Sequence, residues 1–219
     1  MNARLARVVA DDASGRADAV SVLRAGGLVA MPTDTVYGVG VALGAEDGLR
    51  RLFAAKDRPP DRAIVLLVAD LEQAGSVGLL SPAARALAAH FWPGGLTLVL
   101  AQAPGSGLPS DLTAGRSTIG VRMPDHECPR ELARALGPLP VTSANLSGQP
   151  DAREAGAVLG QLGARIDLIL DGGPTRGGVP STVVDCSGDL PRVLRAGAID
   201  GAAIVAALDE AGLPHAIVG

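Results

Sequence analysis

Apolar and polar positions follow two different periods along the chain, and together they predict an α/β protein. Apolar residues three or four apart predict helices over 14–26, 46–55, 82–92, 129–136, 151–162 and 202–208, with Ser14 and Ser81 as helix caps. Short apolar runs predict strands over 28–31, 64–68, 96–100, 118–122, 167–170, 182–185 and 192–194. Several of these strands follow one another without a helix between them, which favours a mixed rather than a fully parallel sheet.

Length and composition fit one folded unit. The chain has 219 residues, 47% of them hydrophobic and 19% charged, which excludes a highly charged disordered protein. No internal repeat or linker is visible, so we expect one domain over 1–219 with its motif-bearing core at about 26–197. The start of the chain has no apolar leader and the longest apolar run, 63–69, cannot span a bilayer, which predicts a cytoplasmic protein without membrane contact.

Charge and cysteine content exclude several kinds of binding site. The net charge of −4 gives no overall field that would attract nucleic acid or an anionic membrane, so any anion site must be local. The 19 basic residues are 18 Arg and one Lys, which makes Lys56 conspicuous. Cys128 and Cys186 have no second Cys or His at metal-ligand spacing, so neither a zinc site nor a disulfide framework is predicted.

Polar segments follow or end the predicted strands, where α/β proteins gather ligand-binding groups. They cover 32–38, 56–59, 117–122, 142–148 and 181–182, with Arg195 downstream. Thr118 and Arg122 stand four apart on one strand, so their side chains share a face. The segments offer hydroxyls, amides and cations but no His or Cys nucleophile. Such a set predicts binding of a polyanion and an amphoteric small molecule, with catalysis by positioning and charge neutralisation.

The ordered motifs MPTDTVYGVG, KDRP, FWPGGLTLVL, TIGVRMP, PVTSANLSG, PSTVVD and VLRAG resemble the YrdC/TsaC family of L-threonylcarbamoyladenylate synthases. The resemblance runs from about Gly26 to Gly197 and implies a YrdC-like twisted mixed sheet, flanked by helices, with a concave cationic cavity. Longer relatives carry a C-terminal domain, so the chain resembles the single-domain form.

The resemblance implies a nucleotidyltransferase. It would form threonylcarbamoyl-AMP and pyrophosphate from L-threonine, bicarbonate or CO2, and ATP, with Mg2+ accompanying the ATP. The product would pass to the tRNA threonylcarbamoyl transferase machinery for t6A modification at tRNA position 37, with weak tRNA contact by this chain left open. Carboxylation turns the amine of threonine into a carbamate, which is itself the nucleophile at the α-phosphorus.

The resemblance also assigns roles to individual side chains. It gives Lys56 and Arg58 the catalytic contacts with the triphosphate and gives no residue a metal-binding role. The ATP-binding set is Lys56, Arg58, Arg62, Thr118, Asn145 and Arg195. The L-threonine-binding set is Thr35, Arg122, Ser143 and Ser181. Thr33 and Asp34 are expected only to shape the turn that carries Thr35.

Two positions depart from the family pattern: Ala63 stands where relatives have Pro, and Leu67 near a position that is often His. A threonine contact is therefore expected to be missing or replaced on that side of the pocket. The Gly-rich stretch 171–179 is a candidate lid.

The same residues bear on two other functions. A non-catalytic RNA-binding module remains the alternative, although the acidic pI and the shortage of aromatics for base stacking speak against it. The length and two cysteines exclude the zinc-finger-bearing carbamoyltransferases of hydrogenase maturation. Which amino acid accepts the carbamoyl group stays open at this stage.

Overall fold

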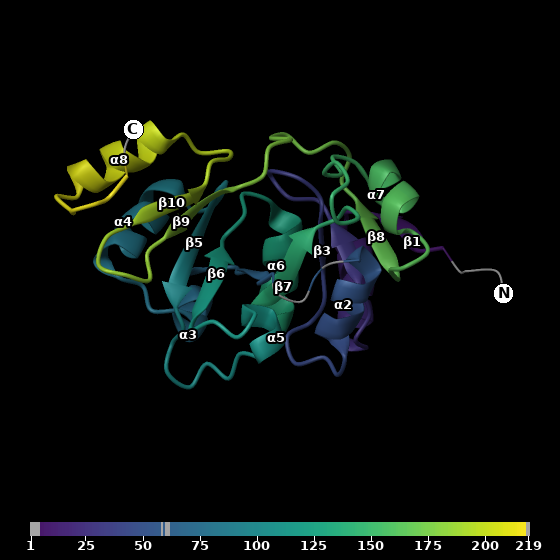
Figure 1. Cartoon of the computed structure of the whole chain (residues 1–219). Helices are drawn as coiled ribbons and strands as arrows, with labels where there is room; N and C mark the ends of the chain where they lie inside the picture. Colours follow the sequence, from purple (N-terminus) through teal and green to yellow (C-terminus); the bar gives the residue numbers. More distant parts are fainter. Residues whose placement is uncertain (1–4, 58, 60–61, 218–219) are drawn as a thin grey trace.

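The computed structural model describes residues 5–57, 59 and 62–217, and its strands form a single ten-stranded sheet (Figure 1). The strands are β1 (Arg7–Ala10), β2 (Val29–Met31), β3 (Gly38–Gly40), β4 (Val65–Leu67), β5 (Leu96–Ala101), β6 (Thr118–Arg122), β7 (Leu139–Ser143), β8 (Leu168–Asp171), β9 (Thr182–Asp185) and β10 (Arg192–Arg195). The helices are α1 (Ala13–Arg24), α2 (Gly48–Lys56), α3 (Leu71–Val77), α4 (Pro82–Phe91), α5 (Ser110–Thr113), α6 (Glu127–Leu136), α7 (Ala155–Leu162) and α8 (Gly201–Glu210).

The sheet is mixed, as the strand pattern predicts. Its order is β1-β8-β2-β3-β7-β4-β6-β5-β9-β10. Parallel pairs join β8 to β1 and β2, β4 to β6, and β5 to β9, while the pairs β2-β3, β3-β7, β4-β7, β5-β6 and β9-β10 are antiparallel. Strands distant in sequence thus become neighbours in the centre of the sheet, where β4 lies between β7 and β6.

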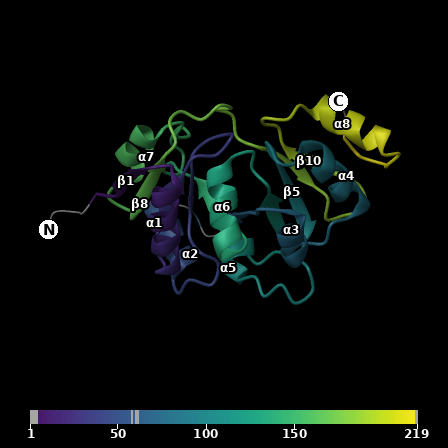
Figure 2. The ribbon, with the colours of Figure 1, turned by 180° about the vertical axis from the view of Figure 1, so that it is seen from behind.

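Helices cover the two faces of the sheet unequally. On one face, α1 and α6 pack over β8, β2 and β7 through a small apolar cluster that includes Leu23, Met31 and Leu132. Figure 2 shows α1 and α6 on this side of the molecule. The other face carries the larger core, in which Leu52 of α2, Leu87 of α4 and Val158 of α7 are buried. No described helix of the chain is long and apolar enough to cross a membrane.

Alternation along the central strands leaves polar side chains on the thinly covered face. In β6, Ile119 and Val121 enter the larger core, whereas Thr118, Gly120 and Arg122 line a cavity on the opposite face. The same division holds in β5, where Leu96, Leu98 and Leu100 are core residues and Thr97 and Val99 line the cavity. Period-two alternation therefore gives one half of the sheet an apolar back and a polar front.

The structure corrects some element predictions. Asp12, not Ser14, caps α1, because its carboxylate accepts a 2.8 Å hydrogen bond from the Gly15 amide. Ser81 caps α4 as predicted, by accepting from the Ala84 amide at 3.2 Å. The sequence reading missed β1, β3, β7, α3 and α5, which have three to seven residues each and carry too short a pattern to be recognised.

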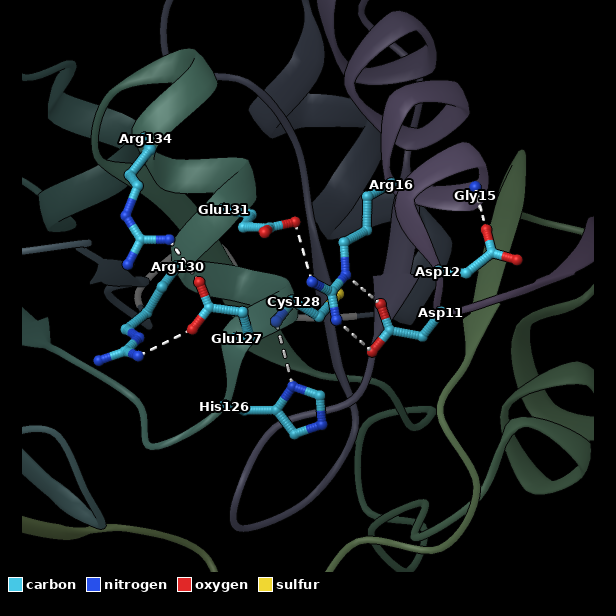
Figure 3. Close-up of polar contacts among 10 residues, drawn as sticks. All are labelled: Asp11, Asp12, Gly15, Arg16, His126, Glu127, Cys128, Arg130, Glu131 and Arg134. Atoms are coloured by element: carbon cyan, nitrogen blue, oxygen red, sulfur yellow. Dashed lines mark hydrogen bonds and ion pairs between the residues drawn. The ribbon is translucent and has the colours of Figure 1, made fainter.

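Ion pairs join the starts of α1 and α6 (Figure 3). Arg16 donates to both oxygens of Asp11, at 2.6 and 3.2 Å, and to Glu131 across the helix interface at 2.8 Å. The Asp11 side chain is only 5% exposed, so the Arg16 guanidinium is the charge that compensates it. His126 caps α6, since its Nδ1 accepts from the Cys128 amide at 3.2 Å.

We predict that Arg16→Met lowers the free energy of unfolding by about 3 kcal/mol or more, because it leaves the buried Asp11 carboxylate uncompensated. The matched control is Arg7→Met, which removes a half-exposed ion pair with Asp18 and should cost less than about 1 kcal/mol. Urea unfolding of both variants measures the difference. Equal losses would contradict the assigned role of Arg16.

His126, the N-cap of α6, predicts that the stability of the fold depends on pH. Burial is the largest cause that lowers the pKa of His126, and the charges of Arg16 and Arg176 also lower it. The charges of Asp11 and Asp34 act in the opposite direction and raise the pKa. A group whose pKa is lowered by folding stabilises the fold above its unfolded value, about 6.5, and that stability is lost as the pH falls below it.

Unfolding free energy should therefore fall between about pH 7.5 and pH 5 in the wild type. His126→Asn keeps a cap acceptor that does not titrate, so its loss of stability over that range should be smaller. Denaturant unfolding at several pH values measures both curves. Parallel curves would show that His126 does not contribute to the pH dependence.

Candidate functional site

A cavity of about 560 Å³ lies on the polar face of the central strands. Its size falls within the range of small-molecule sites. Six of the residues predicted to bind ligands line it together: Thr35, Thr118, Arg122, Ser143, Ser181 and Arg195. They come from four separate polar segments and from the end of β10, which the sheet order brings to one place. Thr118 and Arg122 face the cavity together, as their spacing predicts.

Arg122 lines the cavity and is 6% exposed. Its Nε donates to the carbonyl of Gly94 at 2.9 Å, one terminal nitrogen donates to Thr35 Oγ1 at 2.8 Å, and the other donates to Asp34 Oδ1 at 2.5 Å. The two side chains of the ion pair with Asp34 are 7% and 12% exposed. Arg122 therefore holds the turn at 33–36 against the turn at 92–95.

The electrostatic surroundings of Arg122 combine one carboxylate and one further guanidinium. Burial lowers its pKa, Asp34 raises it, and Arg195 lowers it. A guanidinium nevertheless keeps its charge at neutral pH. The cavity lining carries three guanidinium groups, from Arg116, Arg122 and Arg195, beside the carboxylates of Asp151 and Asp185.

Ser181 and Arg195 form a second bonded group on the β9 side. Ser181 is 6% exposed, and its hydroxyl lies 2.8 Å from the Thr97 hydroxyl. Arg195 donates to the Ser181 carbonyl at 2.7 Å and to its hydroxyl at 3.2 Å. These contacts fix Ser181 at the cavity wall, and the exposed Arg195 covers it from the solvent side.

The structure places Lys56 beneath the turn at 143–145, and Lys56 is not itself among the residues that line the cavity. Lys56 is 2% exposed, and its ammonium group donates to the carbonyls of Ser143 and Asn145 and, at 3.2 Å, to Asn145 Oδ1. Asn145 Oδ1 also accepts from the Ser143 hydroxyl at 2.6 Å, and its Nδ2 donates to the Gln149 carbonyl at 2.6 Å. Lys56 and Asn145 therefore hold Ser143 at the cavity wall in this geometry.

The remaining predicted triphosphate residues, Arg58 and Arg62, follow α2 in the sequence. Arg58 falls outside the described residues. Arg62 is exposed and is not among the residues that line the cavity. The direct contacts of Lys56, Arg58, Arg62 and Asn145 with ATP stay predictions.

Sequence reasoning missed several lining residues. Arg116 precedes β6 and is exposed at the cavity, while Thr97, Asp151 and Asp185 contribute polar groups from other elements. Arg116 lies in the polar stretch directly before the strand that starts at Thr118. This position is the one sequence signal that could have identified Arg116 as a lining residue. Ala63 and Leu67, the two departures from the family pattern, also line the cavity, so both substitutions alter the surface that a ligand meets.

The Gly-rich segment 172–178 packs against the turn that carries Thr35. The amides of Gly177 and Gly178 donate to the carbonyls of Asp34 and Thr35 at 3.0 and 2.8 Å. A Cβ atom at Gly177 would lie 2.7 Å from the Asp34 carbonyl oxygen, and Gly178 has a φ of +65°, so both positions favour glycine. Movement of this segment as a lid stays a prediction.

Tyr37 connects the same segment to the cavity. Its hydroxyl donates to the Gly173 carbonyl at 2.8 Å and accepts from the Gly172 amide at 3.2 Å, and burial raises its pKa to about 12.

The donor set suits a magnesium ion that is carried by phosphates. No group of three or more His, Cys, Asp or Glu side chains among the described residues could hold a metal ion by itself. Magnesium commonly keeps waters and binds through substrate phosphates and one or two carboxylates. The carboxylates of Asp151 and Asp185 on the lining meet that requirement.

Comparison with known proteins identifies sequence relatives over most of the chain. A family model named Sua5_yciO_yrdC, described as "Telomere recombination", matches residues 21–197. The chain is 42% identical to a threonylcarbamoyl-AMP synthase of Bacillus subtilis over 185 residues, which cover 84% of this chain and 53% of the relative. It is 39% identical to a threonylcarbamoyl-AMP synthase of Vibrio vulnificus, with coverage of 70% and 83%. The chain thus spans about half the length of the first relative and most of the second.

Solved structures agree with the fold. A structure of Pyrococcus abyssi Sua5 complexed with L-threonine superposes with a TM-score of 0.87 at 35% identity, and the match covers 96% of this chain and 62% of that one. Escherichia coli YciO superposes with a TM-score of 0.77 at 26% identity, with coverage of 90% and 96%.

The position of Lys56 gives a prediction that separates support of the turn from phosphate binding. Lys56→Met removes the ammonium donor from buried acceptors, so we expect a loss of about 2 kcal/mol or more in unfolding free energy. The exposed Arg62→Met is the control and should change it by less than about 0.5 kcal/mol. Full stability of Lys56→Met together with a raised KM for ATP would instead assign Lys56 to the triphosphate.

Proposed function

The chain belongs to the Sua5/YciO/YrdC family, and from that premise we propose that it is an L-threonylcarbamoyladenylate synthase. The reaction joins L-threonine, bicarbonate or CO2, and ATP into threonylcarbamoyl-AMP and pyrophosphate. The observation that carries the proposal is the convergence of Thr35, Arg122, Ser143 and Ser181 on one cavity that also holds Thr118 and Arg195. A relative of the same fold is described in complex with L-threonine.

Arg122 is the proposed site of the amino-acid carboxylate. A guanidinium has five N–H donors, and three of those of Arg122 are bonded within the protein. The other two remain for a ligand, and paired N–H donors match the two oxygens of a carboxylate. Thr35 and Ser143, which line the same wall, would then meet the amine and hydroxyl end of threonine.

The chemical step needs no nucleophile from the protein. The threonine amine adds to CO2 to give a carbamate and loses a proton, and a carbamate oxygen then attacks the α-phosphorus of ATP while pyrophosphate leaves. The increasing charge on the leaving group calls for nearby cations. We propose that Arg195 and Arg116 on the lining neutralise this charge, together with Arg58 and Arg62, which follow α2 in the sequence.

Thr118, on the β6 side of the cavity, is the proposed neutral contact for ATP, and Asn145 supports the nucleotide end through the turn that Lys56 holds. A magnesium ion bound to the ATP phosphates would be held by Asp151 or Asp185 and would neutralise phosphate charge.

The proposed place of the reaction follows from its product. An acyl adenylate is reactive, so we propose that it passes to the tRNA-modifying transferase that installs t6A, in the cytoplasm. We propose further that the described chain works as one domain, because all its strands belong to one sheet.

The test is pyrophosphate release from ATP with bicarbonate and Mg2+, in the presence of L-threonine, L-serine or no amino acid. We expect release that depends on threonine. Arg122→Lys loses the paired donors, so its kcat/KM for threonine should fall about 100-fold. The control Arg165→Lys alters a guanidinium that pairs with Asp57 away from the cavity and should stay near the wild type. Absence of threonine-dependent release by the wild type would refute the proposed function.

A further inference from the structure

The Thr33 hydroxyl belongs to a buried chain of hydrogen bonds that runs through Thr35 to Arg122. The sequence predicts only that Thr33 shapes its turn. Thr33 is 4% exposed and Thr35 is 2% exposed, and both line the cavity. Thr33 Oγ1 lies 3.0 Å from Thr35 Oγ1, and it accepts from the Thr35 amide at 3.1 Å. The chain continues to Arg122, which donates to Thr35 Oγ1 at 2.8 Å.

The direction of every bond in this chain follows from the number of protons. Thr33 Oγ1 donates to the Val36 carbonyl at 2.7 Å, and a carbonyl oxygen can only accept. A hydroxyl has one proton, so Thr33 has none left for Thr35. In the 3.0 Å contact between the two hydroxyls, Thr35 is therefore the donor and Thr33 the acceptor.

The same reasoning fixes what Thr35 offers to a ligand. Its single proton points to Thr33, and one of its two lone pairs accepts from Arg122. One lone pair remains. Thr35 can thus accept a hydrogen bond from a molecule in the cavity but cannot donate one to it.

We propose that Thr33 is a positioning residue that makes Thr35 an obligate acceptor, so that Thr35 selects an N–H or O–H donor of the amino acid and rejects its carboxylate. This inference rests on the proposed function and deepens it. The carboxylate is left to the two remaining N–H donors of Arg122. The acceptor, Thr35 Oγ1, lies 2.8 Å from the Arg122 nitrogen that donates to it. The two side chains thus orient an amphoteric ligand in one direction.

The backbone around the chain keeps this geometry in place. Asp34 binds the far side of the Arg122 guanidinium and is not among the residues that line the cavity. Gly177 and Gly178 hold the carbonyls of Asp34 and Thr35. The turn is therefore fixed before a ligand binds, which reduces the entropy cost of binding.

The test measures amino-acid binding by calorimetry and turnover by pyrophosphate release. Thr33→Val replaces the hydroxyl by a methyl group, so the Thr35 proton loses its acceptor and can turn into the cavity. We expect the Kd and KM for L-threonine to rise about tenfold or more, with the KM for ATP unchanged. Thr33→Ser keeps the hydroxyl and should restore both values. Thr113→Val, a buried threonine of α5 outside the cavity, is the matched control and should behave as the wild type.

L-2-Aminobutyrate, which lacks the hydroxyl of threonine, identifies the donor. If the Thr33→Val variant loses the preference for threonine over this analogue, Thr35 accepts from the ligand hydroxyl. If the affinity for both amino acids falls equally, Thr35 accepts from the ligand nitrogen. Either result supports the proposal.

Unchanged threonine affinity in folded Thr33→Val overturns the proposal. If that variant does not fold, Thr33→Cys, a weak donor and acceptor of similar size, replaces it with the same expectation. A wild type that binds threonine but releases no pyrophosphate refutes the proposed function alone, and the Kd values still decide on Thr33. A wild type that binds no amino acid overturns both.

Discussion

The buried guanidinium of Arg122 is the interaction on which the arrangement of the site depends. A charge that is 6% exposed must be compensated by nearby groups, because the cost of removing an ion from water is several kcal/mol or more. Arg122 meets this requirement with the Asp34 carboxylate, the Thr35 hydroxyl and the Gly94 carbonyl. The hydrogen bonds that compensate the buried charge of Arg122 thus join β6 to two turns that are far from it in sequence.

The uneven covering of the sheet makes such a charge possible. Behind β6, Ile119 and Val121 pack into the larger core, which provides the hydrophobic stabilisation of these strands. In front, Thr118 and Gly120 line the cavity. A rigid strand with an apolar back therefore holds polar side chains at fixed spacing in front, and this is the preorganisation that binding and catalysis by positioning require.

Buried groups fix the positions of the side chains that a ligand would meet. Lys56 donates to the turn that presents Ser143, and Thr33 determines the direction in which the Thr35 proton points. Both are buried, and both act on the cavity through backbone or hydroxyl contacts. Lys56 thus contacts the turn that carries Ser143 from its buried side.

The sequence by itself determined the fold class, the mixed sheet, most helices and strands, and six of the residues on the cavity lining, because hydrophobic periodicity and ordered motifs are local properties of the chain. It did not determine the short elements β3 and α3, because their few residues carry too little periodicity. Only the tertiary structure decided that Lys56 and Asn145 lie beneath the turn and that Arg116, Ala63 and Leu67 face the cavity. The physical reason is that burial and hydrogen-bond direction depend on partners from other strands, such as Ser143 for Lys56 and Thr35 for Arg122, which come together only when the sheet forms.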